Sequence, residues 1–136
     1  MKKRDKIGFV NGCFDVLHIG HIRLLSFANS KCDKLYVAID SDSKVKGLKG
    51  SDRPFNNQDD RREFLLSIKG IQDVFIYDTV EELEHMVMQL SPDIMVVGKE
   101  YESKGVVGGE HAKRIIFFSR IGSYSTSKIL EGLSHR

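Results

Sequence analysis

Residues 8–21 read Gly-Phe-Val-Asn-Gly-Cys-Phe-Asp-Val-Leu-His-Ile-Gly-His, and this stretch decides the fold. A short apolar strand runs into an Asn11-Gly12 turn, which is followed by a carboxylate, two histidines and a helix. Free backbone N–H groups and the positive end of the helix dipole converge where such a turn meets a helix N-terminus. The stretch therefore predicts an anion-binding site, in which His18 and His21 add hydrogen-bond donors for a phosphate.

The bulk composition fits a globular protein with one core. The chain has 136 residues, of which 40% are hydrophobic and 29% are charged, and its net charge is +2. This length suits one domain, which we expect to span residues 1–136. Basic and acidic side chains are too evenly balanced to predict a nucleic-acid or a membrane partner.

The sequence shows no targeting signal, and this absence and the cysteine usage together favour the cytoplasm. No apolar run approaches the roughly 20 residues that cross a bilayer, and the apolar stretch behind the basic N-terminus is too short for a signal peptide. Cys13 and Cys32 do not form a Cys-x-x-Cys pair. Without a signal peptide we interpret them as reduced thiols, which predicts a cytoplasmic location.

Short apolar runs and amphipathic segments alternate along the chain. Strands rich in Val, Ile, Phe or Tyr are expected at residues 6–11, 34–39, 73–77, 94–98 and 114–118. Helices are expected at residues 19–29, 58–68, 80–90 and 125–133, with Thr79 as the cap of the third. This alternation predicts an α/β fold in a single domain: a Rossmann-like, doubly wound, five-stranded parallel sheet with helices on both faces.

Two polar segments interrupt this rhythm. Residues 41–57 hold several basic side chains, and residues 99–113 hold three glycines. We expect both segments to be loops, because neither shows a regular apolar period. Each follows a strand, and ligands of parallel sheets bind at the carboxyl ends of the strands, so both loops are expected on the ligand face.

Counted from Gly12, the opening stretch reads Gly-x-Phe-Asp-x-x-His-x-Gly-His. This string resembles the HxGH nucleotidyltransferases of the cytidylyltransferase-like family. The resemblance implies that a phosphate oxygen of one substrate attacks the α-phosphorus of a nucleoside triphosphate and that pyrophosphate leaves. Positioning and charge stabilisation suffice for such chemistry. The alternative interpretation of His18 and His21 is that they are two polar residues in the first turn of an amphipathic helix.

The residue types of this string suit that reaction. The catalytic residues implied are His18 and His21, and the nucleotide-binding residues are Gly12, Cys13, Phe14, Asp15 and Gly20. Gly20 allows backbone and base to approach closely, because a Cβ would intrude. Asp15 would repel a phosphate, so we expect it to orient a histidine or an amide, or to hold Mg²⁺.

The basic segment narrows the resemblance. Lys-Gly-x-x-Arg-Pro-x-Asn, with a further arginine at position 61, looks like the adenylyltransferase domain of bacterial heptose-phosphate enzymes, and less like glycerol-3-phosphate cytidylyltransferase. A mobile lysine can close over phosphates. Lys46 is accordingly expected to be catalytic, and acceptor or phosphate binding is assigned to Lys44, Lys49, Arg53 and Arg61. The alternative is a solvated run of charges.

The third block runs from Ser91 to Tyr101 and continues in a Val-Gly-x-Glu string. It resembles the same heptose-type enzymes, with two departures: Val97 where that family usually has lysine, and Glu100 where it usually has aspartate. The resemblance assigns Gly98 and Lys99 to the nucleotide and Glu100 to the acceptor. The alternative is a strand end followed by a flexible loop.

The last block, residues 120–128, resembles the Ser-Thr-Thr motif that opens the final helix of these enzymes. Helix N-termini with free hydroxyls bind phosphates. Arg120, Tyr124, Ser125 and Thr126 are therefore expected to bind the nucleotide, although the hydroxyls can also simply cap the helix.

The resemblance implies a nucleotidyltransferase that uses Mg²⁺ and forms a homodimer. The expected reaction is adenylyl transfer from ATP to a sugar phosphate of the heptose 1-phosphate kind. One alternative is a CTP-dependent cytidylyltransferase acting on glycerol 3-phosphate or a similar acceptor. An alternative of another class is a nucleotide-binding module without catalysis.

Overall fold

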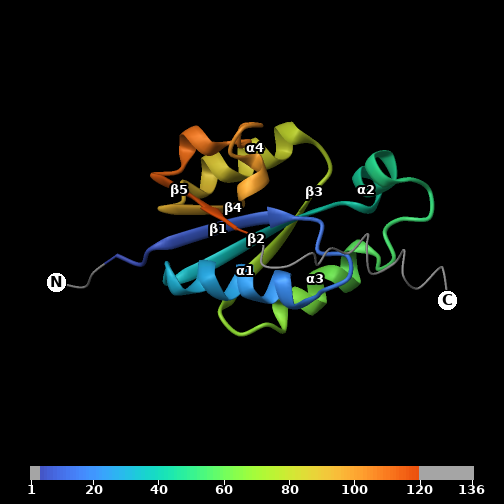
Figure 1. The fold of residues 1–136 in the computed structure, drawn as a ribbon, viewed down its shortest axis with the longest axis horizontal. Helices are drawn as coiled ribbons and strands as arrows, with labels where there is room; N and C mark the ends of the chain where they lie inside the picture. Colours follow the sequence, from blue (N-terminus) through green and yellow to red (C-terminus); the bar gives the residue numbers. More distant parts are fainter. Residues whose placement is uncertain (1–3, 120–136) are drawn as a thin grey trace.

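The apolar runs of the sequence form the five strands of one parallel sheet, in the order β3-β2-β1-β4-β5 (Figure 1). The structure is a computed structural model that describes residues 4–119. The strands are β1 (Ile7–Gly12), β2 (Lys34–Asp40), β3 (Ile71–Tyr77), β4 (Ile94–Gly98) and β5 (Arg114–Phe118). All five predicted strands and their parallel arrangement are confirmed.

Three of the four predicted helices are present: α1 (Ile19–Ser30), α3 (Gln58–Leu66) and α4 (Val80–Leu90). Each is preceded by a cap residue whose side chain accepts a backbone hydrogen bond, as Thr79 does from the N–H of Glu82 at 3.1 Å. The predicted helix at 125–133 lies outside the described residues.

The prediction that residues 41–57 form a loop is wrong for the first half of this segment. Helix α2 (Asp42–Lys49) begins after Ser41, whose hydroxyl accepts from the N–H of Lys44 at 3.1 Å and donates to Asp78 at 2.6 Å. The helix escapes a pattern search because Val45 is its single buried residue, so it has no periodic apolar face. Segment 99–113 also contains two short turns of 3₁₀ helix, η1 (Lys99–Tyr101) and η2 (Gly109–His111).

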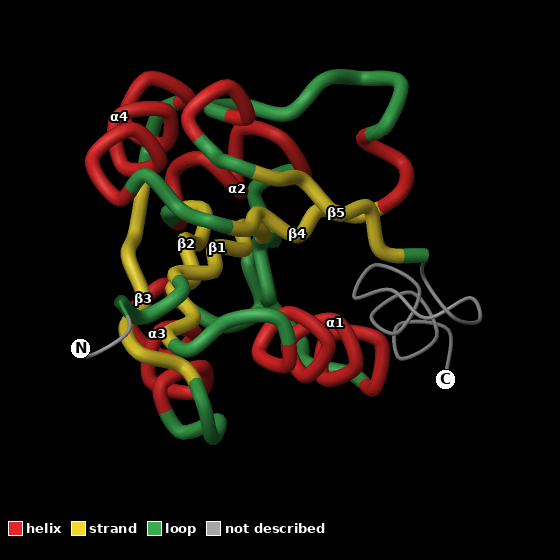
Figure 2. Tube along the Cα trace, turned by 90° about the vertical axis from the view of Figure 1, so that its left-hand side faces the viewer, coloured by secondary structure: helices red, strands yellow, loops and turns green. Residues whose placement is uncertain are grey.

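Helices cover both faces of the sheet (Figure 2), and one apolar core lies on each face. Leu25 of α1 and Leu65 of α3 pack against one face together with Val37 of β2. Val87 of α4 packs against the other face with Met95 of β4. Because the central strands contribute to both cores, they show continuous apolar runs and no polar alternation.

The topology brings the carboxyl ends of the strands to one edge of the sheet. Strand β1 pairs with β2 on one side and with β4 on the other, so the strand order reverses between β1 and β4. Ligands of doubly wound sheets bind at such a reversal. In residues 4–119, no helix is long and apolar enough to cross a bilayer.

Candidate functional site

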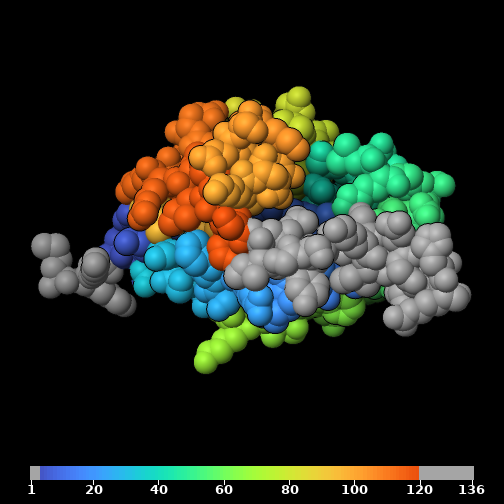
Figure 3. All heavy atoms as spheres, in the orientation of Figure 1, coloured from blue at the N-terminus to red at the C-terminus, as the bar shows by residue number. Residues whose placement is uncertain are grey.

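A cavity of about 690 Å³ lies at the carboxyl edge of the sheet, a volume typical of small-molecule sites. Helix α2 and the segment that follows β4 stand on either side of the end of β1 (Figure 3). Ten of the residues predicted from the sequence line this cavity: Gly12, Cys13, Phe14, His18, Gly20, His21, Lys44, Lys49, Gly98 and Glu100.

His18 and His21 together cap the N-terminus of α1. Nδ1 of His18 accepts a hydrogen bond from the N–H of Gly20 at 3.1 Å, and Nδ1 of His21 accepts one from the N–H of His18 at 3.2 Å. The rings stack with centroids 3.9 Å apart and an interplanar angle of 23°. Because Nδ1 is the acceptor in both rings, each neutral imidazole carries its proton on Nε2. The pair is therefore suited to donating hydrogen bonds to an anion.

The turn before these histidines is held in an unusual backbone conformation. Phe14 is buried and has a φ of 51°, in the left-handed region that non-glycine residues seldom adopt. Its ring lies 5.2 Å from the ring of His21 and folds back over Gly12, where an added Cβ would come within 3.0 Å of Phe14 Cε2. Such strain persists only where the surroundings enforce it, and it is typical of binding sites.

Asp15 does not fit the role of a metal ligand that the sequence suggested. It is buried, and its carboxylate accepts hydrogen bonds from the N–H groups of Phe55 and Asn56, both at 2.7 Å, and from Nε of Arg53 at 3.1 Å. It is not among the residues that line the cavity. Asp15 anchors the segment after α2 to the turn after β1, and the paired Arg53 lies with it outside the lining.

Arg61 is likewise a structural residue, in contrast to its expected phosphate-binding role. Its side chain is completely buried. The guanidinium donates to the carbonyl oxygens of Cys13 (3.0 Å), Asp40 (2.7 Å) and Asn56 (3.0 Å), and to the carboxylate of Asp42 (2.9 Å). With its donors used in this way, Arg61 ties the ends of β1 and β2 to the start of α2.

The lysines of α2 divide between two environments. Lys44 and Lys49 line the cavity, and Nζ of Lys44 lies 5.8 Å from the centre of the Tyr77 ring. Lys46 is exposed and is not part of the lining. The static geometry therefore does not bring the expected catalytic lysine to the histidines.

Glu100 and Gly98 approach the cavity from the end of β4, whereas Lys99 is exposed and does not line it. An added Cβ on Gly98 would meet both carboxylate oxygens of Glu100 at 2.6 Å, so this carboxylate lies directly over the backbone of Gly98. The expected nucleotide-binding residues Arg120, Tyr124, Ser125 and Thr126 lie outside the described residues.

Sequence reasoning missed several polar residues of the lining, among them Asn11, Asp40 and Tyr77. Asn11 Nδ2 donates to Tyr77 Oη at 3.4 Å, and the Asp40 carboxylate lies near the Tyr77 hydroxyl. Burial, reinforced by the Asp40 charge, raises the pKa of Tyr77 far above its ordinary value, so the phenol is neutral. Their position at the ends of neighbouring predicted strands was the signal in the sequence that could have identified them as lining residues.

Cys13 lines the cavity as a free thiol. Burial raises the pKa of its thiol above the ordinary value, although the neighbouring Lys49 and Arg61 act in the opposite direction. The thiolate is the reactive form of cysteine. The raised pKa disfavours a nucleophilic role for Cys13.

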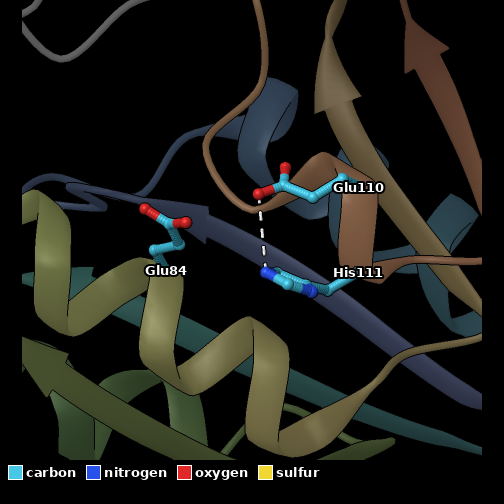
Figure 4. Close-up of side chains that lie close together, drawn as sticks. All are labelled: Glu84, Glu110 and His111. Carbon is cyan, nitrogen blue, oxygen red and sulfur yellow. Dashed lines mark ion pairs between the residues drawn. The ribbon is translucent and has the colours of Figure 1, made fainter.

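A second group of ionisable side chains lies on the surface where α4 meets η2 (Figure 4). Ligand atoms of Glu84, Glu110 and His111 lie within 4.8 Å of one another, and His111 Nε2 is 3.4 Å from a carboxylate oxygen of Glu110. Both glutamates are exposed. None of the three lines the cavity, so this group is separate from the site at the strand ends.

Comparison with known sequences identifies relatives over most of the chain. Residues 9–131 match the profile of the cytidylyltransferase-like family. The bifunctional protein HldE of Nitratiruptor sp. is 42% identical over 132 residues, which are 96% of this chain and 28% of that protein. The bifunctional protein HldE of Hyphomonas neptunium is 39% identical over 129 residues, 92% of this chain and 26% of that protein. The chain thus spans about a quarter of these relatives.

Solved structures share the fold. The lipopolysaccharide core biosynthesis protein from Thermoplasma volcanium has a TM-score of 0.66 at 22% identity, covering 90% of this chain and all of that one. A bifunctional NMN adenylyltransferase/ADP ribose pyrophosphatase from Francisella tularensis has a TM-score of 0.68 at 14% identity, covering 97% of this chain and 43% of that one.

Proposed function

The chain belongs to the cytidylyltransferase-like family of nucleotidyltransferases, and on that premise we propose that it transfers a nucleoside monophosphate from a nucleoside triphosphate to the phosphate of a small metabolite. A phosphate oxygen of the acceptor forms a bond to the α-phosphorus. The bond between the α-phosphorus and the oxygen bridging to the β-phosphate breaks, and pyrophosphate leaves with that electron pair. Atoms and charge balance without a covalent enzyme intermediate.

The observation that carries this proposal is the stacked pair of His18 and His21. Both imidazoles accept backbone hydrogen bonds at Nδ1, which holds the two rings at the helix N-terminus, where they line the cavity. Negative charge grows on the α-phosphate and the leaving pyrophosphate as the reaction proceeds. Donors fixed in advance stabilise that charge without further reorganisation.

The proposed pair of substrates is ATP and a sugar phosphate of the heptose 1-phosphate kind. Identity of 39–42% to bifunctional HldE proteins over most of the chain supports it, as does the Arg53-Pro54 string. The alternative is CTP with glycerol 3-phosphate or a similar acceptor, which the family name favours.

In the proposed reaction, Lys46 contacts the phosphates of the substrates after α2 pivots about its N-terminal end. Asp42 anchors the start of α2 through Arg61 at 2.9 Å and through its own N–H, which donates to Gln58 at 2.9 Å. Residues 46–50 at the other end are all exposed. A helix held at one end can pivot there, and lysines on mobile segments commonly close over bound phosphates.

Mg²⁺ is proposed to enter as part of the nucleotide substrate. Asp15 is occupied by Arg53 and two backbone N–H groups, so it does not fit as a resident ligand for the ion. Mg²⁺ is commonly bound through substrate phosphates with most of its waters retained. The homodimer expected from the resemblance is likewise a proposal, which light scattering during size-exclusion chromatography would test.

Pyrophosphate release measured with ATP, CTP, GTP and UTP against a panel of phosphorylated acceptors tests the proposed reaction. We expect turnover with one nucleotide and one class of acceptor, abolished by EDTA and restored by Mg²⁺. Thermal shift identifies the nucleotide independently, since a ligand of the native state raises its melting temperature. Nucleotide binding without turnover for every acceptor would instead favour the non-catalytic binding module.

A further inference from the structure

The cavity has one side at the end of β4 and another at the ends of β2 and β3, because these strands lie on opposite sides of β1. The strand order reverses between β1 and β4, and the proposed function therefore puts the nucleotide at the histidines and the end of β4. Asp40 ends β2 and Tyr77 ends β3, on the opposite side of β1 from β4. This second side is left for the acceptor, so an inference about it rests on the proposed function.

The polar groups on this side form a connected set with unused hydrogen-bonding capacity. Asn11 Nδ2 donates to Tyr77 Oη, and the Asp40 carboxylate is near enough to the Tyr77 hydroxyl to raise its pKa. A carboxylate accepts several hydrogen bonds, and an amide nitrogen donates two. Asp40 can therefore accept a further O–H, and Asn11 can donate a further N–H, both toward the cavity that these residues line.

The chemistry of this set excludes two kinds of ligand group. A phosphate would be repelled by the Asp40 carboxylate. A quaternary ammonium at Asp40 and the Tyr77 ring would be repelled by the Lys44 ammonium, which already lies 5.8 Å from the centre of that ring. A neutral hydroxyl both donates and accepts, and it matches an arrangement of one carboxylate and one amide.

The position of this set is built into the fold. Arg61 holds the carbonyl oxygen of Asp40 at 2.7 Å, and the backbone N–H of Ser41 donates to the carbonyl oxygen of Tyr77 at 2.8 Å. Tyr77 is buried. The polar groups are thus preorganised, which is what selective hydrogen bonding to a ligand requires.

We propose that Asp40, Tyr77 and Asn11 form the subsite that recognises hydroxyl groups of the acceptor, so that the acceptor is a phosphorylated sugar or polyol whose phosphate lies toward Lys44. Cationic acceptors such as phosphocholine are excluded. A site built to bind a hydroxyl rejects the analogue that lacks it, because its buried polar groups are then left unpaired. Asp40 and Tyr77 are accordingly specificity-determining residues.

The test compares hydroxylated probes with deoxygenated partners of the same shape. Mannose 1-phosphate is paired with cyclohexyl phosphate, and glycerol 3-phosphate with propyl phosphate; phosphocholine is the cationic probe. Calorimetry measures the Kd of each probe in the presence of a non-hydrolysable nucleotide, and pyrophosphate release gives KM for acceptor and nucleotide separately. The variants are Tyr77→Phe and Asp40→Asn, with Tyr36→Phe as the matched control, since Tyr36 stacks on Phe75 outside the lining.

We expect the wild-type chain to prefer at least one hydroxylated probe over its partner by about 10-fold or more, as for a hydrogen bond to a charged group. Tyr77→Phe and Asp40→Asn should reduce that preference to less than about 3-fold, with KM for the nucleotide within about 2-fold and an unchanged circular dichroism spectrum. Tyr36→Phe should leave the preference intact.

Three results would overturn the subsite. They are equal binding of hydroxylated and deoxygenated probes by the wild type, a preference for phosphocholine, and a rise of the nucleotide KM alone in the Tyr77→Phe variant. A failure of the proposed function looks different: no pyrophosphate release with any pair. The Kd comparison still decides the subsite in that case, because it does not depend on turnover.

Discussion

The imidazole of His21 accepts a hydrogen bond from the backbone N–H of His18, and the two rings stack with centroids 3.9 Å apart. Each of the two side chains thus accepts a backbone hydrogen bond at the N-terminus of α1. Replacement of either residue changes two things together: a helix cap, and a hydrogen-bond donor at the cavity. Conventional alanine variants cannot separate these contributions.

His18→Asn separates them. Asparagine is among the best N-cap residues and can accept the bond from Gly20, but it carries nothing in the place of Nε2. We expect kcat to fall by about two to three orders of magnitude with little change in the free energy of unfolding. His18→Ala should lose activity similarly and also cost about 1 kcal/mol of stability. Near-wild-type kcat in a folded His18→Asn variant would remove the histidine from the chemistry.

Lys46→Ala tests whether α2 turns when the nucleotide binds. Lys46 is exposed outside the cavity, so its substitution affects catalysis only through a closed form. We expect KM for a phosphate-bearing substrate to rise about 10-fold, which corresponds to one lost charge-assisted hydrogen bond. The control is Lys31→Ala, because Lys31 is also exposed but follows the end of α1, away from the cavity lining. An unchanged kinetic profile would make Lys46 an ordinary solvated lysine.

Arg61 and Arg62 make a matched pair for a stability measurement. Arg61 is completely buried and bonds to three carbonyl oxygens and one carboxylate. Its truncation to alanine leaves these acceptors unpaired, so we expect a loss of about 3–5 kcal/mol in urea unfolding. Arg62 is 42% exposed and pairs with Asp73 on the surface, so Arg62→Ala should cost less than about 1 kcal/mol. Equal losses would contradict the structural assignment of Arg61.

Asp93 should make stability depend on pH in the acidic range. Hydrogen bonds from Arg4 (2.7 Å) and from the N–H of Ile7 (2.8 Å), with help from Lys113 at 3.2 Å, hold the pKa of this carboxyl well below its ordinary value. A pKa lowered in the folded state stabilises the protein above the unfolded value, near 4, and this contribution is lost as the pH falls toward the folded value.

The measurement compares the melting temperatures of wild type and Asp93→Asn at pH 7 and at about pH 3. We expect the variant to be several degrees less stable at pH 7 and the gap to narrow at the lower pH. Asp5→Asn, at an exposed side chain paired with Lys34 at 3.4 Å, serves as the control. A gap that is constant with pH would show that the loss comes from packing and not from the charge.

Local patterns carried much of the fold and part of the site. The five strands were predictable because strands buried on both faces are continuous apolar runs, and His18 and His21 were predictable because a helix start follows a strand at short range. Helix α2 was not, since a surface helix with Val45 as its single buried residue has no apolar period.

Side-chain roles that depend on distant partners required the tertiary structure. The charge of Arg61 and of Asp15 made both look like ligand-binding residues, and only their burial and their partners across the chain showed that they brace the turn after β1. Tyr77 meets Asn11, 66 residues away in sequence, because β1 and β3 flank β2. The order of residues along the chain specifies which elements form, since that depends on near neighbours. The set of groups that faces a ligand depends on the order of strands in the sheet, which no local pattern contains.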